Sequence, residues 1–174
     1  MRVIGGEFRS RLLKSVPGTD VRPTPDRLRE ALFNVLAPRI EKTVFADIYA
    51  GTGAVGIEAL SRGAARAIFV ESNRSALAAL RANLWSLDLW DRAQVLHTRA
   101  MAALPTLDAD IFFLDPPYRL GPEYDAALDL LGARAPKLVV VQHDIRQQLR
   151  ESYGTLRQVR QLRQGDNVLS FYQQ

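Results

Sequence analysis

Short apolar runs alternate with longer amphipathic segments along most of the chain. Residues 111–114 (IFFL) and 139–141 (VVV) are continuous in apolar side chains, which is typical of strands buried on both faces of a sheet. Residues 75–87 instead place leucine at helical spacing, which predicts a helix with one face on the core. The whole pattern predicts strands at residues 44–48, 67–71, 93–97, 110–114, 137–143, 156–162 and 167–172, and helices at 25–36, 53–62, 75–87, 100–104, 122–132 and 144–152.

This alternation indicates an α/β fold, with a mostly parallel sheet covered by helices on both faces. Residues 164–167 (QGDN) predict a tight turn between the last two strands, so the sheet should end in an antiparallel hairpin. Thr24 and Pro25 suit the N-cap and the first position of the first helix. The 174 residues suit one compact unit, in which we distinguish an N-terminal basic extension, residues 1–38, from a main domain, residues 39–174.

A glycine-rich turn follows the first strand. Gly51, Gly53 and Gly56 have the G-x-G-x-x-G spacing of nucleotide-binding turns. The first two glycines would let the backbone turn tightly and approach a ligand, and the third would let helix and strand pack closely. The next strand ends in Glu71, where a carboxylate can accept hydrogen bonds from ribose hydroxyls. Both NAD and S-adenosylmethionine suit such a unit.

Three features favour S-adenosylmethionine over NAD. Asp47 is an acid inside the first strand, where it can face the amino group of a methionine moiety. Only about 100 residues follow Glu71, which leaves little room for the second domain that an NAD enzyme needs. The motif at residues 115–118 (DPPY) has no obvious role in hydride transfer.

Asp115, Pro116, Pro117 and Tyr118 form a stiff loop after a buried strand. Proline fixes φ near −65° and has no N–H to donate, so the polar groups of the loop are acceptors, the Asp115 carboxylate and the Pro116 carbonyl. Acceptors beside an aromatic ring suit a planar base that carries an NH₂ group, with Tyr118 stacked on the base. The two acceptors would aim the nitrogen lone pair at a methyl donor, and no strong base is required.

The net charge of +4 is concentrated near the N-terminus. Residues 1–29 contain seven basic and three acidic side chains, and residues 30–174 contain sixteen of each sign. A basic segment beside a neutral domain suggests contacts with nucleic-acid phosphates. The substrate-binding candidates in this segment are Arg2, Arg9, Arg11, Lys14 and Arg22.

The composition bears on metal binding, disulfide bonds and membrane association. The chain has no cysteine and two histidines, so disulfides and thiolate metal sites are excluded and no metal is expected. No apolar run reaches the ~18 residues typical of a membrane span, and the Arg-rich N-terminus does not have the form of a signal peptide. We therefore expect a cytoplasmic protein that does not engage a membrane.

The motifs together resemble a known family. Asp47, Ala50, Gly51, Thr52, Gly53, Gly56 and Glu71, followed by the motif at 115–118, have the order and spacing of class I amino-methyltransferases. Residues 2–11 (RVIGGEFRSR) and 22–34 (RPTPDRLREALFN) are similar to the N-terminus of the bacterial 16S rRNA (guanine-N2)-methyltransferase family, the small-subunit rRNA methyltransferase D. The resemblance extends over essentially the whole chain, and its N-terminal part makes it specific.

The resemblance implies a Rossmann-like sheet of seven strands, with the last strand inserted beside the fifth. It implies S-adenosylmethionine as the methyl donor, bound by the glycine-rich turn and Glu71, with S-adenosylhomocysteine as product. The catalytic residues would be Asp115, Pro116 and Tyr118, and Pro117 and Tyr118 would contact the substrate with the basic arm. The acceptor would be the N2 amine of a guanine in 16S rRNA, within the 30S subunit or an assembly intermediate, and the enzyme would act as a monomer.

One position departs from the pattern. Methyltransferases often carry Asp or Asn after the third strand to bind the adenine amine, but this chain has Arg99, which cannot accept a hydrogen bond. The adenine contact is therefore left to the backbone or to Thr98.

Three other functions stay open. DNA adenine-N6 and protein glutamine-N5 methyltransferases use a similar loop, although the glutamine enzymes usually have Asn in place of Asp115 and the DNA enzymes usually carry a separate recognition domain. A non-catalytic RNA-binding or assembly factor could also have this fold, but both sites are intact in the sequence.

Overall fold

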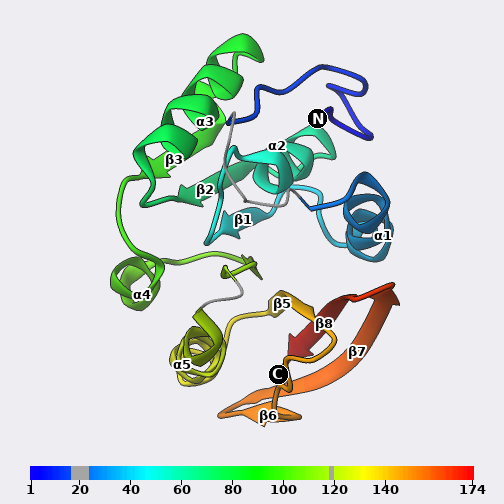
Figure 1. Ribbon diagram of the computed structural model, residues 1–174, viewed down its shortest axis with the longest axis vertical. Coiled ribbons are helices and arrows are strands. Elements are labelled where there is room, and N and C mark those ends of the chain that lie inside the picture. The colour runs from blue at the N-terminus through cyan, green and yellow to red at the C-terminus, as the bar shows by residue number, and fades with distance from the viewer. Residues whose placement is uncertain (17–23, 118–119) are drawn as a thin grey trace.

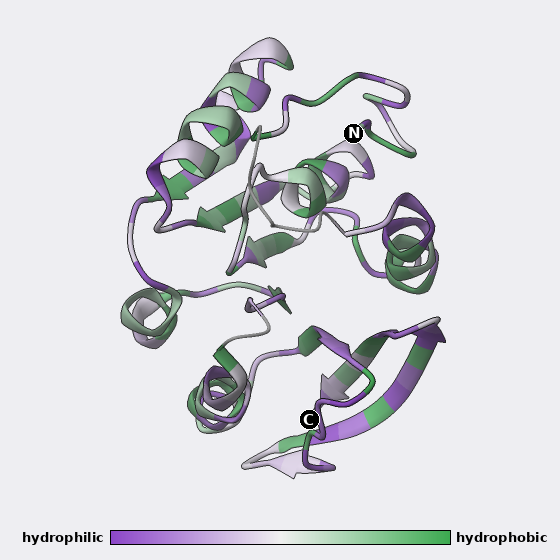
Figure 2. Ribbon diagram, viewed as in Figure 1, coloured by the Kyte–Doolittle hydropathy of each residue, from purple (hydrophilic) through white to green (hydrophobic). Residues whose placement is uncertain are grey.

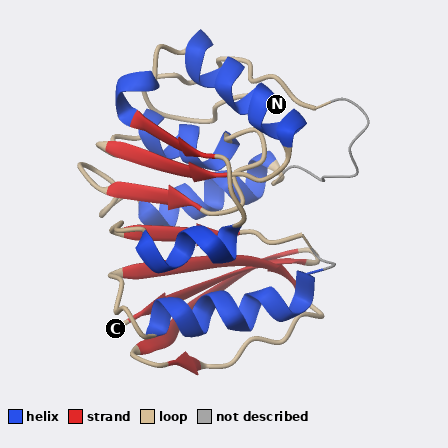
Figure 3. Cartoon of the chain, turned by 90° about the vertical axis from the view of Figure 1, so that its left-hand side faces the viewer, coloured by secondary structure: helices blue, strands red, loops and turns tan. Residues whose placement is uncertain are grey.

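The computed structural model describes residues 1–16, 24–117 and 120–174. Its centre is an eight-stranded sheet with the order β3-β2-β1-β4-β5-β8-β7-β6. The first five strands are parallel, and the last three join the sheet antiparallel (Figure 3). The strands are β1 (Val44–Asp47), β2 (Arg66–Val70), β3 (Ala93–Leu96), β4 (Ile111–Leu114), β5 (Leu138–Asp144), β6 (Ser152–Tyr153), β7 (Leu156–Gln164) and β8 (Asn167–Gln173).

Helices cover both faces of the sheet. Along β1, Phe45 packs in one core cluster with α1 and α2, whereas Ala46 and Ile48 pack in another with α4 and α5. This alternation follows from the two-residue period of a strand. Figure 1 shows α4 and α5 on one side of the sheet and α1 on the other. The helices are α1 (Asp26–Leu36), α2 (Ala54–Ser61), α3 (Arg74–Ser86), α4 (Ala100–Ala103) and α5 (Gly121–Gly132), with short 3₁₀ helices η1 (Trp90–Arg92) and η2 (Leu104–Thr106).

The predicted α/β class, the parallel core and the terminal hairpin are confirmed, but the sheet has eight strands and not seven. The additional strand is β6, whose two residues pair with the start of β7. The parallel strands are mainly hydrophobic, whereas β7 is mostly hydrophilic, as Figure 2 shows. A two-residue strand has no periodicity that a sequence pattern could reveal.

The predicted helix at residues 144–152 is wrong. Strand β5 extends to Asp144, and turns and irregular chain follow it. The Asp144 carboxylate accepts hydrogen bonds from both the backbone N–H (2.9 Å) and the Nε (2.8 Å) of Arg146. Such a local bond gives the backbone an alternative to the first helical turn.

The first helix also begins differently from the prediction. Its N-cap is Pro25, its first residue is Asp26, and no side chain caps it. The hydroxyl of Thr24 instead lies 3.5 Å from Oδ2 of Asp115, to which it donates. A residue predicted as a local cap thus contacts the candidate acceptor site.

Candidate functional site

The candidate site lies at one edge of the sheet, where β1, β2 and β4 end. Strand β1 pairs with β2 on one side and with β4 on the other. The chain adds β2 and β3 on one side of β1 and then crosses to add β4 and β5 on the other side, so the strand order reverses between β1 and β4. Open α/β sheets bind ligands at such a switch point, beyond the carboxyl ends of the strands. The structure brings the glycine-rich turn, Glu71 and Asp115 to this one edge.

The glycine-rich turn needs glycine for two different reasons. Gly51 and Gly53 have φ values of 55° and 83°, which L side chains rarely adopt. A Cβ on Gly51 would meet no atom within 4 Å, so this part of the turn is open toward a ligand. A Cβ on Gly56 would lie 2.2 Å from the ring of Phe69, so this glycine permits close packing of α2 on β2.

Glu71 connects the end of β2 to the glycine-rich turn. Its Oε2 accepts the N–H of Gly51 (2.8 Å) and its Oε1 accepts the N–H of Asn73 (2.6 Å). An ionised carboxylate has about four lone-pair sites, so two remain for the hydroxyls of a ribose. The half-buried Glu71 can therefore support the turn and bind a sugar at the same time.

Asp47 has a structural contact that the sequence did not reveal. Its side chain is 1% exposed, and Oδ2 accepts the N–H of Gly56 at 2.9 Å. Gly56 is the third residue of α2, whose N-cap Gly53 offers no side-chain cap, so Asp47 satisfies one of the unpaired amides at this helix start. Burial raises the pKa of Asp47 to about 7, with repulsion from Asp115 and Glu71 adding to the effect and the Gly56 bond opposing it.

Asp115 and Pro116 follow directly after β4. Burial raises the pKa of Asp115 to about 7, against a lowering effect from the Thr24 hydroxyl. The residue as a whole nevertheless keeps partial solvent exposure. Pro116 is buried and Pro117 is exposed. Tyr118, the predicted stacking residue, and Arg22 lie outside the described residues.

Tyr124 is a site residue that the sequence analysis missed. Its ring is 1% exposed, and its hydroxyl donates to the Pro116 carbonyl at 3.2 Å. A carbonyl has two lone pairs, and among the described residues only Tyr124 bonds this one, so the second can accept from a substrate amine. Tyr124 lies in α5, within the helix predicted at residues 122–132, and its spacing from the other buried residues of that helix is typical of core packing.

Residues 1–16 of the basic arm are anchored largely through their backbone. Two of their cationic side chains also have partners: Arg2 lies 3.9 Å from Oδ2 of Asp26, and Arg11 donates to the Ser86 carbonyl at 3.2 Å. The buried carboxylate of Glu58 accepts the N–H groups of Ile4 and Gly5, both at 2.8 Å. An antiparallel bridge joins Arg2 to Leu12 within the arm. The predicted substrate-binding side chains in the described part of the arm are all exposed: Arg2, Arg9, Arg11 and Lys14.

Asn83 links this arm to the glycine-rich turn. Its Oδ1 accepts the N–H of Lys14 (2.7 Å), and its Nδ2 donates to the carbonyls of Lys14 (3.1 Å) and Thr52 (3.0 Å). The side chain is 1% exposed. A polar residue among the leucines of α3 was the only sequence signal for this link.

The residues after the third strand are polar, but none of them has a contact that assigns it to the adenine of the cofactor. Arg99 is exposed and is the N-cap residue of α4, without a side-chain capping bond. The ring of His97 lies 3.2 Å from the carbonyl oxygen of Ser72, which joins the loop after β3 to the loop after β2. It therefore stays a prediction that the backbone or Thr98 contacts the adenine.

Comparison with known proteins identifies the relationship. The model of the family described as Conserved hypothetical protein 95 matches residues 1–173. This chain is 35% identical to the Bacillus subtilis protein YlbH, over 99% of this chain and 98% of YlbH. The chain belongs to this family. It is also 43% identical to the Ribosomal RNA small subunit methyltransferase D of Escherichia coli, in an alignment that covers 70% of this chain and 62% of that protein.

Solved structures have the same architecture. The structure of yhhF from Escherichia coli superposes with a TM-score of 0.87 at 35% identity, over 100% of this chain and 97% of that one. An RNA methyltransferase from Salinibacter ruber, solved with S-adenosylhomocysteine, shares the fold at a TM-score of 0.66 and 15% identity, over 86% and 92% of the chains. The predicted family and Rossmann-like fold are confirmed.

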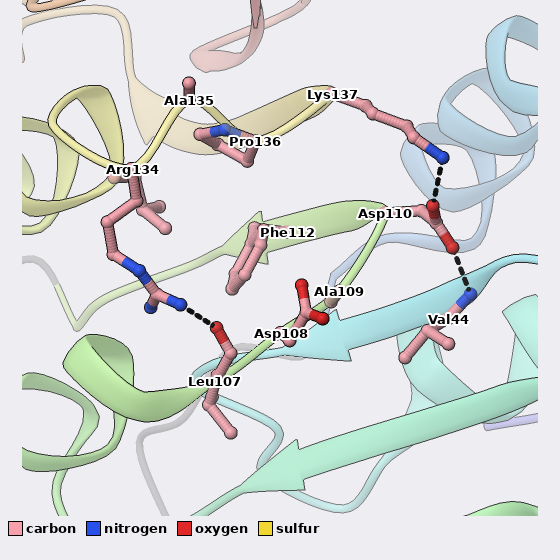
Figure 4. Close-up of a pocket in the computed structure, with 11 residues that line it drawn as sticks. Val44, Leu107, Asp108, Ala109, Asp110, Phe112, Arg134, Ala135, Pro136 and Lys137 are labelled. Atoms are coloured by element: carbon pink, nitrogen blue, oxygen red, sulfur yellow. Dashed lines mark hydrogen bonds and ion pairs between the residues drawn. The ribbon is translucent and has the colours of Figure 1, made fainter.

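A hollow of about 360 Å³ lies away from this site (Figure 4). It is lined by residues at the amino ends of β1, β4 and β5, which is the opposite edge of the sheet. Three of its charged groups already have partners: Lys137 pairs with Asp110 at 2.6 Å, and Arg134 donates to the carbonyls of Leu104 and Leu107. This hollow is therefore no candidate for methyl transfer.

Neither a metal site nor a membrane span is found in the part of the chain that the structure describes. Within residues 1–16, 24–117 and 120–174, no three His, Cys, Asp or Glu side chains are grouped to hold a metal ion. Among the same residues, no helix is long and apolar enough to cross a bilayer.

Proposed function

We propose that this protein transfers a methyl group from S-adenosylmethionine to the exocyclic N2 amine of a guanine in 16S rRNA. The observation that carries the proposal is the position of two acceptors, the Asp115 carboxylate and the Pro116 carbonyl, beside a nucleoside-type turn at the same switch point. Membership in a family that includes rRNA methyltransferases supports the substrate class.

The residues present fit the cofactor. Gly51 is open toward a ligand, and the two remaining lone pairs of Glu71 suit ribose hydroxyls. Asp47 is close enough to this turn to bond Gly56, which is consistent with the predicted role near the methionine amino group. Bound S-adenosylmethionine supplies an electrophilic methyl group on a sulfonium. The roles of Ala50, Thr52 and Gly53 are to shape the turn that would hold it.

The acceptor loop can orient an amine without a strong base. The lone pair of an exocyclic guanine amine is delocalised into the ring, so the nitrogen is a weak nucleophile. Hydrogen bonds from its two N–H groups to Asp115 and Pro116 would favour the pyramidal nitrogen and fix its direction. This role requires the Asp115 carboxylate to be ionised, because a protonated carboxyl group donates where an acceptor is needed.

The raised pKa of Asp115 makes its ionisation depend on nearby charge. A pKa of about 7 in the substrate-free protein leaves the group partly protonated at neutral pH. A positive charge nearby favours the ionised form and lowers the pKa of a carboxyl group. Asp115 would therefore be in the ionised, acceptor form when the methyl donor is bound nearby.

The basic arm supports an RNA substrate. Its four described cationic side chains are exposed, whereas its backbone is held by the buried Glu58 and Asn83. Charge that is exposed on a fixed scaffold suits contact with phosphates. We further propose that the rRNA is bound within the 30S subunit or an assembly intermediate, and that one copy of the protein acts on it.

The test is a methyl-transfer assay with labelled S-adenosylmethionine. Undermodified 30S particles, deproteinised 16S rRNA, duplex DNA and a glutamine-containing peptide serve as competing acceptors, and nuclease digestion with mass spectrometry identifies the modified nucleoside. N2-methylguanosine from rRNA is expected. Asp115→Ala should abolish the signal, with Asp108→Ala, an exposed acid at the opposite edge, as the matched control. Label in DNA or peptide alone, or at another position of the base, would contradict the proposal.

A further inference from the structure

A second group of exposed cationic side chains lies in the C-terminal hairpin. Residues 145–174 contain five arginines and two acids. Two of these arginines are neutralised, because Arg146 pairs with Asp144 and Arg150 pairs with Asp129. The other three lie along β7, are exposed, and have no carboxylate partner within the described residues: Arg157, Arg160 and Arg163.

Strand β7 runs from the side of the sheet where the parallel strands begin to the side where they end. Near its end, the strand pairs with β8 up to the turn after Gln164, whose side chain reaches the Arg27 carbonyl at 3.4 Å. Figure 1 shows the arrowhead of β7 beside α1. Asn167 pairs with Asp144 at the carboxyl end of β5, so Arg163 lies at the edge that carries Asp115. Arg157 lies six residues earlier, roughly 20 Å along the strand at 3.3 Å per residue.

A hollow of about 400 Å³ lies beside Arg163, within the ~300–1,000 Å³ range of small-molecule sites. Three glutamines line it, and an amide side chain can both donate and accept, as the edge of a nucleobase requires. Burial lowers the pKa of His143 in its wall, which favours the neutral ring. The lining residues are His143, Ile145, Gln147, Gln148, Leu149, Gln161, Arg163 and Val168.

The wall of this hollow is connected to the acceptor loop. The ring of His143 packs edge-on against the ring of Tyr124, with centroids 6.4 Å apart. Tyr124 in turn donates to the Pro116 carbonyl. The wall of the hollow is therefore in contact, through Tyr124, with the loop that is proposed to hold the target base.

Arg163 is prepared to bind an anion. Its Nε donates to the carbonyl of Gly165 at 3.0 Å, and its two terminal nitrogens have no hydrogen bond to a described residue. The exposed carboxylate of Asp166 lies in the same turn and would oppose an anion. Removal of the Arg163 charge should therefore weaken anion binding, and removal of the Asp166 charge should strengthen it.

We propose that Arg163 and the hollow beside it bind a nucleotide of the rRNA strand next to the methylated base, with its phosphate on Arg163. The inference rests on the proposed function. A base can enter the acceptor loop only if it is unstacked, and the strand on either side must then be held. The N-terminal arm packs on α2 and α3, on the side of Asp115 where β2 lies. The hairpin lies on the other side of Asp115, where β8 lies, so the two basic segments could hold the strand on either side of the target base.

The experiment compares Arg163→Gln with Arg157→Gln. Both changes remove one exposed charge from the same strand, so only the position differs. Binding to deproteinised 16S rRNA and to undermodified 30S particles is measured at several salt concentrations. Arg163→Gln should weaken binding about tenfold, as loss of a hydrogen bond to a charged group implies. It should also lower the log–log salt slope by about 0.7–0.9. Arg157→Gln should bind like the parent, and Asp166→Asn should bind more tightly.

The affinity for S-adenosylhomocysteine should be unchanged in all three variants, since none of these residues lies at the cofactor turn. If Arg163→Gln and Arg157→Gln bind rRNA equally, the inference is overturned while the proposed function stands. If the loss occurs on 30S particles but not on deproteinised rRNA, the surface contacts a ribosomal protein and the nucleotide assignment is wrong. If the unaltered protein neither binds nor methylates rRNA, the proposed function itself fails.

Discussion

Replacement of Asp115 by Asn should stabilise the substrate-free protein at pH 8 while it impairs methyl transfer. The pKa of this carboxyl group is 3.8 in the unfolded reference and about 7 in the folded protein. A raised folded pKa means that folding favours the neutral form. The carboxyl group therefore does not lower the free energy of unfolding below about pH 4, and it lowers it increasingly as the pH rises toward 7.

The size of this cost follows from the shift. About three pKa units at 1.36 kcal/mol each give roughly 4 kcal/mol as an upper limit above pH 7. Asp115 keeps partial solvent exposure, so we expect about 1–3 kcal/mol. Asn has nearly the same shape, cannot ionise, and can still accept the Thr24 hydrogen bond with its amide oxygen.

Urea unfolding at pH 5 and at pH 8 tests this reasoning. The stability difference between Asp115→Asn and the parent should be clearly larger at pH 8, and Asp108→Asn, which alters an exposed acid, should show no such trend. In parallel, kcat/KM for S-adenosylmethionine, which reports the substrate-free protein, should rise with pH through about 7, because the acceptor must be ionised. A stability difference that is identical at both pH values would refute the assignment of a raised pKa to Asp115.

Three further predictions concern the cofactor, the acceptor loop and the arm. Glu71→Ala should weaken S-adenosylhomocysteine binding at least about tenfold by calorimetry, since hydrogen bonds to a charged group contribute roughly 1.5–3 kcal/mol each; unchanged affinity would make Glu71 only a support of the Gly51 turn. Tyr124→Phe should lower kcat with little change in cofactor affinity, because it frees the Pro116 carbonyl from a positioning bond; an unchanged kcat would reduce Tyr124 to core packing. Changing the four exposed basic residues of the arm to Gln should weaken rRNA binding and lower its log–log salt slope by about 0.7–0.9 per lost phosphate contact, with cofactor affinity intact; binding equal to the parent at every salt concentration would make the arm ordinary surface.

The candidate site was predictable because each of its motifs ends a parallel strand. Apolar runs located β1, β2 and β4, and the carboxyl ends of parallel strands meet at one edge, so the turn at Gly51, Glu71 and Asp115 had to be neighbours. No contact between distant segments was needed for this inference. The same local rules correctly gave the hairpin around Gly165, whose φ of 61° suits a tight turn.

Contacts between distant segments could not be predicted. Thr24 and Asp115 are 91 residues apart, and Lys14 and Asn83 are 69 apart, yet each pair is hydrogen-bonded. Thr24 was assigned to a helix cap because that was the local use of its hydroxyl. Asp47 bonds Gly56 only because α2 folds back over the end of β1.

The sequence by itself determined the α/β order of elements, the edge at which the motifs meet and the family to which the chain belongs. These properties depend on periodicity, glycine conformation and residue spacing, which are local. The tertiary structure alone decided which polar groups are paired: Asp47 with Gly56, Tyr124 with Pro116, and Asn83 between the arm and Thr52. The physical reason is that a buried polar group must find a partner wherever packing brings one within about 3 Å, and packing is set by the whole chain.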